Sequence, residues 1–354
     1  MSEAPPKITL WKLLLPVAIG LGATAYLMWK ADFNFSALTS APFSKSRLVI
    51  GLLLGVLAVL SRDLAFMYKL RLSTGSKMTW LKTFQTITMW EFCACISPKV
   101  AEAPFVLYVL KNSGLTAGKT IAVYMLNAFF DNVAFVVMFS LLVLVLGNHL
   151  LDFTHQDCGY LVGHEVMQKI RDFAHLVWYG YGVIFCAVIF LGVALFILPH
   201  ATKRFFHRLS VLPVLSRFKE SIATLGDEVE ITAHEFRNMP LGFWVKMTVA
   251  TFVNWISRYL LALALLYAFS IVNFDFVIAL SRQYALWIFT GIPSTPGATG
   301  VAEVSFIALN CEFMPFSYDV ALAIALVWRL YSYYLYLLLG LIVLPKWSKQ
   351  IAQR

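Results

Sequence analysis

The chain has 354 residues, of which 60% are hydrophobic and 13% are charged, and its mean hydropathy is +0.75. Water-soluble domains carry about 25% charged residues, so this composition excludes that class and predicts an all-α, polytopic membrane protein. The formal net charge of +9 indicates anchoring on the cytoplasmic side of a membrane, and we expect no nucleic-acid partner. We expect residues 1–354 to form a single transmembrane domain.

Six apolar stretches are long enough to cross a bilayer, which takes about 20 helical residues. They cover residues 8–29, 48–70, 121–146, 176–198, 243–269 and 320–344. The first stretch is longer than the core of a signal peptide, which has about 7–15 residues, and it lacks a cleavage site of small residues. We therefore expect it to be a retained helix.

Two pairs of shorter apolar stretches remain, at 80–96 with 100–110 and at 276–292 with 301–311. The second member of each pair is too short to cross a bilayer as a helix. Each pair turns at a similar phrase, SPKVAE at 97–102 and TPGATGVAE at 295–303, in which a proline interrupts the helix. We predict two re-entrant helical hairpins beside about six full spans, and the alternative is a chain with ten spans.

Lysine and arginine are frequent between 199 and 240 and at the C-terminus, and they are rarer between 148 and 175. The positive-inside rule then places both termini in the cytoplasm and the 148–175 loop outside. The two hairpins would enter from opposite sides, which makes an inverted repeat. Residues 200–240 are predicted to form a basic, amphipathic connector on the cytoplasmic membrane surface, with a solvated linker helix as the alternative.

The turn of each hairpin carries a lone carboxylate in apolar surroundings, where a charge costs roughly 2.5–3.5 kcal/mol. Because of this cost, we expect the two carboxylates to have a function. Broken helices of this kind form the binding sites of transporters. The helix start exposes free N–H groups, and glycine lets the backbone approach a ligand. The candidate residues are Glu102, Glu303, Pro98, Pro296, Gly297 and Gly300. Alternatively, each glutamate caps its own helix, and Lys99 is a local partner for Glu102.

Further charges lie within the predicted membrane segments, where such residues face the bundle interior and pair with one another. They are Arg62, Asp63, Asp131, Arg258, Arg282 and Arg329. The arginine fork donates two parallel hydrogen bonds and suits phosphate. We predict that Arg258, Arg282 and Arg329 hold an anionic headgroup, while Glu303 gates the path or balances charge. Asp63, Asp131 and Glu102 are further opposite charges available for pairing. Structural ion pairs are the alternative.

No nucleotide-binding loop, dinucleotide fingerprint or catalytic constellation occurs in the sequence, so we expect no cofactor and no enzyme activity. The cysteines in apolar segments, including Cys311, are expected to act as small hydrophobic residues. Cys158 lies near three histidines in a pattern that matches no metal-ligand spacing. We expect these to be ordinary loop residues and predict no metal site.

Several phrases resemble a known family. They are MLNAFFDN at 125–132, SRYL at 257–260, RQ at 282–283, PSTPGATGVAE at 293–303 and WRLYSYY at 328–334. With them, residues from about 48 to 344 resemble the transmembrane-region family of lysylphosphatidylglycerol synthases. Family members often carry a glycine pair where this chain has Ala101 and Glu102.

The resemblance implies a lipid-handling membrane protein. In fused members, this region moves a modified phospholipid between leaflets and a separate domain synthesises it. That domain is not recognised here, so the resemblance does not imply synthesis. We predict a flippase-like translocase of the bacterial inner membrane that moves a phosphate-bearing lipid. The alternatives are a lipid-binding accessory protein for a lipid- or glycan-modifying partner enzyme, and a membrane enzyme that acts on a lipid headgroup.

Overall fold

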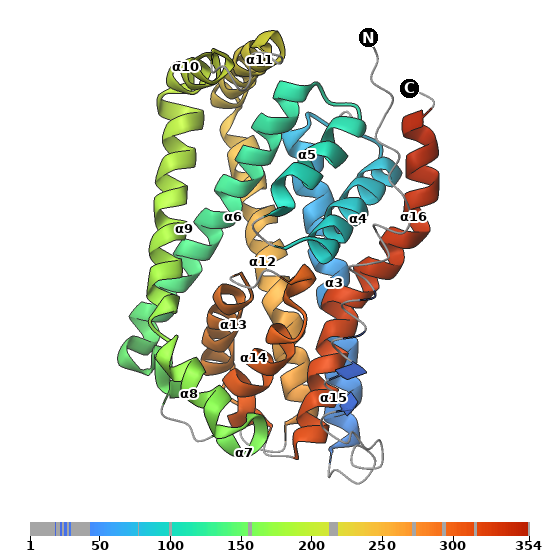
Figure 1. Ribbon diagram of the computed structural model, residues 1–354, viewed down its shortest axis with the longest axis vertical. Helices are drawn as coiled ribbons and strands as arrows, with labels where there is room; N and C mark the ends of the chain where they lie inside the picture. Colours follow the sequence, from blue (N-terminus) through green and yellow to red (C-terminus); the bar gives the residue numbers. More distant parts are fainter. Residues whose placement is uncertain are drawn as a thin grey trace.

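A computed structural model gives a bundle in which every regular element of the described residues is helical (Figure 1). The structure describes residues 43–352 apart from 77, 99–100, 155–157, 212–218, 271–273, 292–294 and 315–316, together with six positions between 18 and 29. The stretch predicted at 8–29 therefore falls almost entirely outside the described residues. The longer helices are α3 (Lys45–Ser73), α4 (Trp80–Ile96), α5 (Glu102–Asn112), α6 (Ala117–Leu146), α8 (His164–Asp172), α9 (Leu176–Gly192), α10 (Pro199–Ser210), α11 (Lys219–Arg237), α12 (Leu241–Phe269), α13 (Phe276–Gly291), α14 (Val301–Asn310), α15 (Tyr318–Arg329) and α16 (Leu335–Ala352).

Five helical segments in the described part of the chain are long and apolar enough to cross a membrane. They are Lys45–Ser73, Ala117–Leu146, Leu176–Ile197, Leu241–Phe269 and Tyr318–Lys349. Their outer faces expose large apolar side chains such as Leu53, Leu144 and Phe190, which water would disfavour and lipid accepts. The chain is a polytopic helical membrane protein, as the composition predicts.

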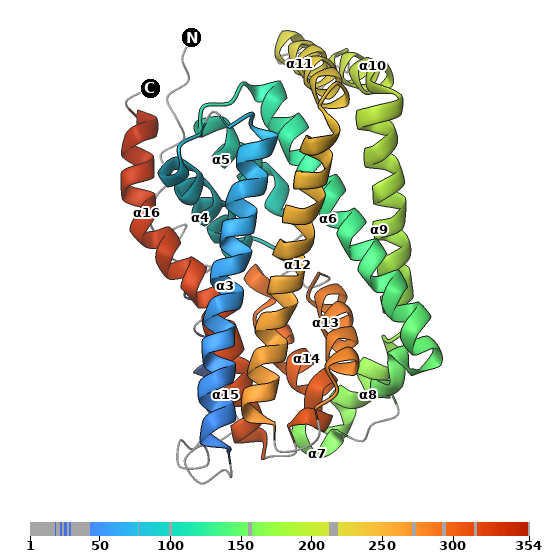
Figure 2. The same ribbon diagram turned by 180° about the vertical axis from the view of Figure 1, so that it is seen from behind.

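Helices α3 and α12 run side by side along the length of the bundle (Figure 2). A Cβ atom at Gly51 would overlap Ala268, so the backbones can approach this closely only because Gly51 has no side chain. Farther along the pair, the Asn254 amide donates to the Arg62 carbonyl at 3.0 Å, and the hydroxyls of Ser257 and Ser61 lie 3.1 Å apart. Small residues and interhelical hydrogen bonds therefore hold this pair together, as in other membrane bundles.

The two predicted helix pairs are present, and they occupy opposite halves of the bundle with their turns facing each other (Figure 1). Helices α4 and α5 have 17 and 11 residues, and α13 and α14 have 16 and 10 residues. At 1.5 Å per residue, the shorter arm of each pair reaches only about half of a ~30 Å hydrocarbon layer. The predicted bounds agree within two residues, because proline and glycine end these helices.

The last long helix is interrupted by a π-helical turn over Leu330–Tyr334, directly after Arg329. The sequence predicts one uninterrupted span here, and the structure joins α15 to α16 through this wider turn. Such turns are frequent at functional sites, because the extra residue redirects the flanking side chains. The turn therefore separates the part of the helix that carries Arg329 from the part that carries Tyr336.

The two ends of the bundle differ in chemistry. One end carries the pair α10 and α11, which is rich in charged residues of both signs, and the other carries the short helix α7 (Gly159–Val162) and α8 (Figure 1). At the second end, Cys158 and Cys311 form a disulfide, with Cα atoms 6.1 Å apart. The prediction of an ordinary loop cysteine and a small hydrophobic residue was therefore wrong, because neither residue carries a free thiol. A bridge across 153 residues has no signature in local spacing.

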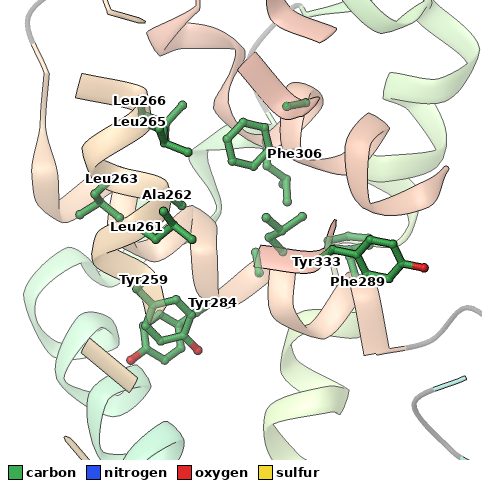
Figure 3. Close-up of a cluster of buried hydrophobic side chains, with 14 of the residues drawn as sticks. Tyr259, Leu261, Ala262, Leu263, Leu265, Leu266, Tyr284, Phe289, Phe306 and Tyr333 are labelled. Atoms are coloured by element: carbon green, nitrogen blue, oxygen red, sulfur yellow. The ribbon is translucent and has the colours of Figure 1, made fainter. Parts of the chain in front are cut away.

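A large hydrophobic cluster is centred on α12, α13, α14 and the last long helix. Figure 3 shows buried side chains from these elements, among them Leu265, Phe289 and Phe306. The rings of Tyr259 and Tyr284 lie 4.3 Å apart between their centroids, and Figure 3 shows them side by side. This packing fixes α12 against the arms of the second hairpin and forms a rigid base for the cavity described next.

Candidate functional site

A cavity of about 210 Å³ lies where the two hairpin turns meet in the middle of the bundle. The first hairpin contributes Ala94 and Ser97, and the second contributes Thr290, Gly291, Gly297 and Ala298. Hydroxyl, amide and guanidinium groups make part of the wall polar, and the rest is apolar. The remaining lining residues come from α3, α12, α13 and the last long helix: Val59, Arg62, Ser257, Arg258, Tyr259, Leu261, Ala262, Gln283, Leu286, Trp287, Trp328, Arg329 and Ser332.

The charged groups in this wall are three guanidinium groups, those of Arg62, Arg258 and Arg329. They come from α3, α12 and α15, so three separate long helices converge on the cavity. Within the described part of the chain, no carboxylate lines the cavity, although carboxylates pair with the arginines behind the wall. The cavity is therefore electropositive, and its arginines offer the planar donors that phosphate accepts.

Arg329 is held in place by the turn of the second hairpin. Its Nε donates to Glu303 Oε1 at 2.8 Å, and its Nη2 donates to the Gly297 carbonyl at 2.8 Å and to the Thr299 hydroxyl at 3.3 Å. Glu303 is fully buried, and its other oxygen, Oε2, accepts a 2.7 Å hydrogen bond from the Gly300 N–H. Glu303 therefore caps its own helix and also holds Arg329. The capping role that the sequence offered as an alternative is therefore present, together with an ion pair to a buried arginine.

The conformation of this turn depends on Gly297. Its φ of +57° is unfavourable for residues with a Cβ atom, and a Cβ atom there would overlap the ring of Tyr333. The same ring lies under the Arg329 guanidinium, 4.2 Å from centroid to Cζ, which is cation–π geometry. The glycine thus lets Tyr333 reach both the turn and the arginine.

The other two arginines share one carboxylate, Glu91 of α4. Arg62 Nη2 lies 2.6 Å from Glu91 Oε1 in an ion pair that lacks hydrogen-bond alignment, and Arg258 Nη2 donates to the same oxygen at 3.3 Å. Arg62 also lies 3.7 Å from Asp63, which accepts a hydrogen bond from Tyr336. The sequence-based candidates did not include Glu91. A lone carboxylate in the apolar segment WEFCAC was the signal that could have identified it.

A second cavity of about 270 Å³ lies beside the first and shares Ala94, Arg258 and Trp287 with it. Its charged lining residues are Lys69, Glu91, Glu102, Asp131 and Arg258. This cavity therefore combines three carboxylates with two cations, in contrast to the electropositive first cavity. Arg258 borders both.

Asp131, a predicted site residue, lies in the wall of this second cavity. Its Oδ1 accepts hydrogen bonds from Lys69 Nζ at 2.6 Å and from Trp255 Nε1 at 2.7 Å. Lys69 is 1% exposed and lies near the end of the predicted second span. The structure extends α3 to Ser73, so Lys69 is inside the helix bundle and pairs with α6. Helix α3 ends at the turn over Thr74 and Gly75, where Gly75 has a positive φ.

An apolar groove of about 660 Å³ lies on the outer side of the α3–α12 pair. Leu57, Leu60 and Leu64 line it and are largely exposed, and Lys246 is its one charged lining residue. Ser61 lines the groove, and Ser257, whose hydroxyl lies 3.1 Å from that of Ser61, lines the first cavity. The groove and the electropositive cavity are therefore separated at this point by two serine side chains.

The remaining predicted residues lie around these cavities. Arg282 lines neither; its Nη2 and Nε lie 2.9 and 3.2 Å from Glu312 Oε1, and its side chain is 1% exposed. Glu303 lies behind Arg329, and Pro98 lies next to the lining residue Ser97. Pro296 and Gly300 flank the lining residues Gly297 and Ala298. Lys99, the proposed partner of Glu102, lies outside the described residues.

Comparison with known families agrees with these features. The family model for the lysylphosphatidylglycerol synthase TM region matches residues 13–340, which include both hairpins and all three cavity arginines. No curated protein and no solved structure matches the chain. The family concerns membrane lipids, and its match covers nearly the whole helix bundle. The chain belongs to the lysylphosphatidylglycerol synthase transmembrane-region family.

Proposed function

We propose that the protein is a flippase-like translocase that moves a phosphate-bearing lipid between the leaflets of the bacterial inner membrane. The observation that carries this proposal is the cavity between the hairpin turns, whose charged lining consists of Arg62, Arg258 and Arg329. A phosphate group would bind as an additional counter-ion on the cavity side of these arginines, whose carboxylate partners lie behind the cavity wall. Interactions between charged groups are strong there, because the surroundings have a low dielectric constant.

The groove beside the cavity supports a lipid rather than a free anion. A phosphate at Arg62 or Arg258 lies next to the Ser61–Ser257 contact, and the apolar groove begins on the other side of that contact. Hydrocarbon chains in the groove would remain in contact with the bilayer, so only the headgroup needs a polar path. The second cavity, with its three carboxylates, would then neutralise the arginines when the headgroup leaves.

The proposed step moves a lipid without making or breaking a covalent bond, so we propose no enzyme activity for this chain. We further propose that both hairpins are re-entrant and that the bundle has both termini in the cytoplasm. The lysines and arginines of α10 and α11 favour the cytoplasmic side for their end of the bundle. The Cys158–Cys311 disulfide favours an oxidising compartment for the opposite end.

The test is lipid transfer by purified protein in vesicles that contain a headgroup-labelled anionic phospholipid, with the outer-leaflet label quenched by a membrane-impermeant reductant. Arg329→Lys keeps the charge but loses the fork, and Arg329→Ala removes both. We expect transfer to fall about tenfold with Arg329→Lys and further with Arg329→Ala, since one charge-assisted hydrogen bond contributes about 1.5–3 kcal/mol. Rates are expressed per folded molecule.

The matched variant is Arg282→Ala. It removes an equally buried arginine that is paired with Glu312 and lines neither cavity. We expect transfer per folded molecule to stay close to that of the unmodified protein. Equal losses in Arg329→Ala and Arg282→Ala would contradict the assignment of the cavity. Tight lipid binding without any transfer would instead favour the accessory role, in which a lipid- or glycan-modifying enzyme receives the lipid.

A further inference from the structure

A second cluster of ionisable side chains lies far from the cavities, on the helices α10 and α11. It consists of His200 of α10 and of Glu230 and His234 of α11. Each offers one ligand atom, and these atoms lie within 4.8 Å of one another. From this geometry we propose that the three side chains bind a divalent first-row transition metal ion of the zinc type.

The packing of the two helices brings these residues together. Gly226 of α11 lies against Phe206 and the Lys203 carbonyl of α10, where a Cβ atom would be 2.9 Å and 3.2 Å from them. The helices therefore approach closely at this point. Glu230 and His234 are four residues apart and share one face of α11, and that face meets the first turn of α10 at His200. The imidazoles of His200 and His234 lie 5.5 Å apart between ring centroids.

The two oxygens of Glu230 have separate partners. Oε1 faces His200 Nδ1, whereas Oε2 lies 3.1 Å from Lys203 Nζ, which also contacts Asp227 Oδ1 at 2.9 Å. A ligating carboxylate commonly accepts a hydrogen bond at its second oxygen, which fixes the orientation of the first. Lys203 would play this part, and the Glu230 side chain, only 12% exposed, is already held in place.

The donor atoms select the class of ion. Two imidazole nitrogens and one carboxylate oxygen are the set that zinc accepts at three-ligand sites with an open fourth position. Calcium and magnesium prefer oxygen donors, so they fit this set poorly. His200 is largely exposed, which gives the ion an entry path and leaves room for water at the fourth position. The ion would join α10 to α11 and stiffen the connector between α9 and α12.

The experiment measures binding of Zn²⁺ alone to the full-length protein in detergent, after removal of any histidine tag, by competition with a chromophoric indicator at about neutral pH, where imidazole is mostly neutral. We expect one bound ion per chain. His200→Ala, Glu230→Gln and His234→Ala should each weaken binding by at least about tenfold. Co²⁺ should give the visible absorption of a four-coordinate site, which these variants should lose.

The matched control is His207→Ala. His207 belongs to α10, is half-exposed, and contacts Asp227 at 3.4 Å without belonging to the cluster. We expect its loss to change the affinity by less than about twofold. Absence of Zn²⁺ binding to the unmodified protein, or an equal loss in His207→Ala and His234→Ala, would overturn the proposal. A second measurement is the shift in thermal unfolding on adding Zn²⁺, which the unmodified protein should show and the cluster variants should lose. This proposal is independent of lipid transfer.

Discussion

The two hairpins begin their second arms with similar sequences, yet the glutamate at the end of each sequence has a different environment. In the second hairpin, Glu303 is fully enclosed and holds Arg329 and its own helix start. In the first, Glu102 is partly exposed and lines the second cavity. The difference follows from glycine: the second phrase has Gly297 and Gly300 at positive φ, whereas the first phrase contains no glycine. The shared Val-Ala-Glu ending can therefore place its glutamate in a buried ion pair or in the wall of a cavity.

The other ends of the hairpins differ as well. In the second, Gln283 donates to Asn310 at 3.0 Å, Arg282 pairs with Glu312, and Cys311 is bonded to Cys158. In the first, the hydroxyls of Thr86 and Ser113 lie 2.8 Å apart at the corresponding end. The second hairpin is thus tied at both ends. If one hairpin moves during transport, this comparison favours the first.

The largest expected effect separates the two glutamates. Glu303→Gln leaves the charge of Arg329 buried without its carboxylate, and we expect the free energy of unfolding to fall by about 3–5 kcal/mol. Glu102→Gln should cost less than about 1 kcal/mol, because its carboxylate is partly exposed. Denaturant unfolding in mixed micelles measures both. The double variant Glu303→Gln/Arg329→Met should recover part of the loss, and equal losses for the two glutamines would break the comparison.

The next effect concerns the disulfide at the far end of the second hairpin. Replacing Cys158 and Cys311 together by alanine should lower the free energy of unfolding by about 2–4 kcal/mol, because the bridge restrains the unfolded chain. A reductant should lower the stability of the unmodified protein to the same value and leave the double variant unchanged. Cys186→Ala, at an exposed free cysteine, is the control and should have no such effect.

A smaller effect distinguishes the two glycines of the second turn. Gly297→Ala combines a positive φ with overlap of Tyr333, and we expect a loss of about 2–3 kcal/mol. Gly300→Ala has a φ of +88° but open space around the added Cβ, so about 1–2 kcal/mol is expected. Thermal unfolding of both variants is the measurement. A larger loss at Gly300 would show that Tyr333 does not constrain the turn.

The smallest effect compares the hydrogen bonds between the arms. Thr86→Val should cost about 0.5–1.5 kcal/mol, the net contribution of an ordinary hydrogen bond. Gln283→Leu leaves the buried Asn310 amide without its partner and should cost about 1–3 kcal/mol. Denaturant titrations measure the free energy of unfolding of both variants. If Thr86→Val costs more, the first hairpin is the one that is held more tightly.

Most of the helices could be predicted from the sequence, since apolar length and proline are local signals. The arms Trp80–Ile96 and Val301–Asn310 begin and end next to such signals. The cavity arginines Arg258 and Arg329 were also predictable, because a charge in an apolar segment is rare. The partners of the arginines could not be predicted. Arg282 and Arg329 lie in equally apolar sequence segments, and only the fold directs Arg282 toward Glu312 and Arg329 toward the cavity.

Three further features depend on contacts distant in sequence. Glu91 joins α4 to α3 and α12, Lys69 joins α3 to α6, and the disulfide joins α7 to the end of α14. No local pattern encodes such partners. The π-helical turn after Arg329 is likewise absent from the hydropathy pattern, because it changes the backbone hydrogen bonding and leaves the residue types in the span unchanged.

The thin wall between the groove and the electropositive cavity has a consequence for lipid selectivity. A lipid held as proposed would place its glycerol region across the hydroxyls of Ser61 and Ser257. The groove is lined by exposed leucines, so acyl chains of different length and unsaturation would fit it about equally well. Discrimination among lipid species would then depend on the guanidinium groups, which respond to the charge and shape of the headgroup and not to the hydrocarbon.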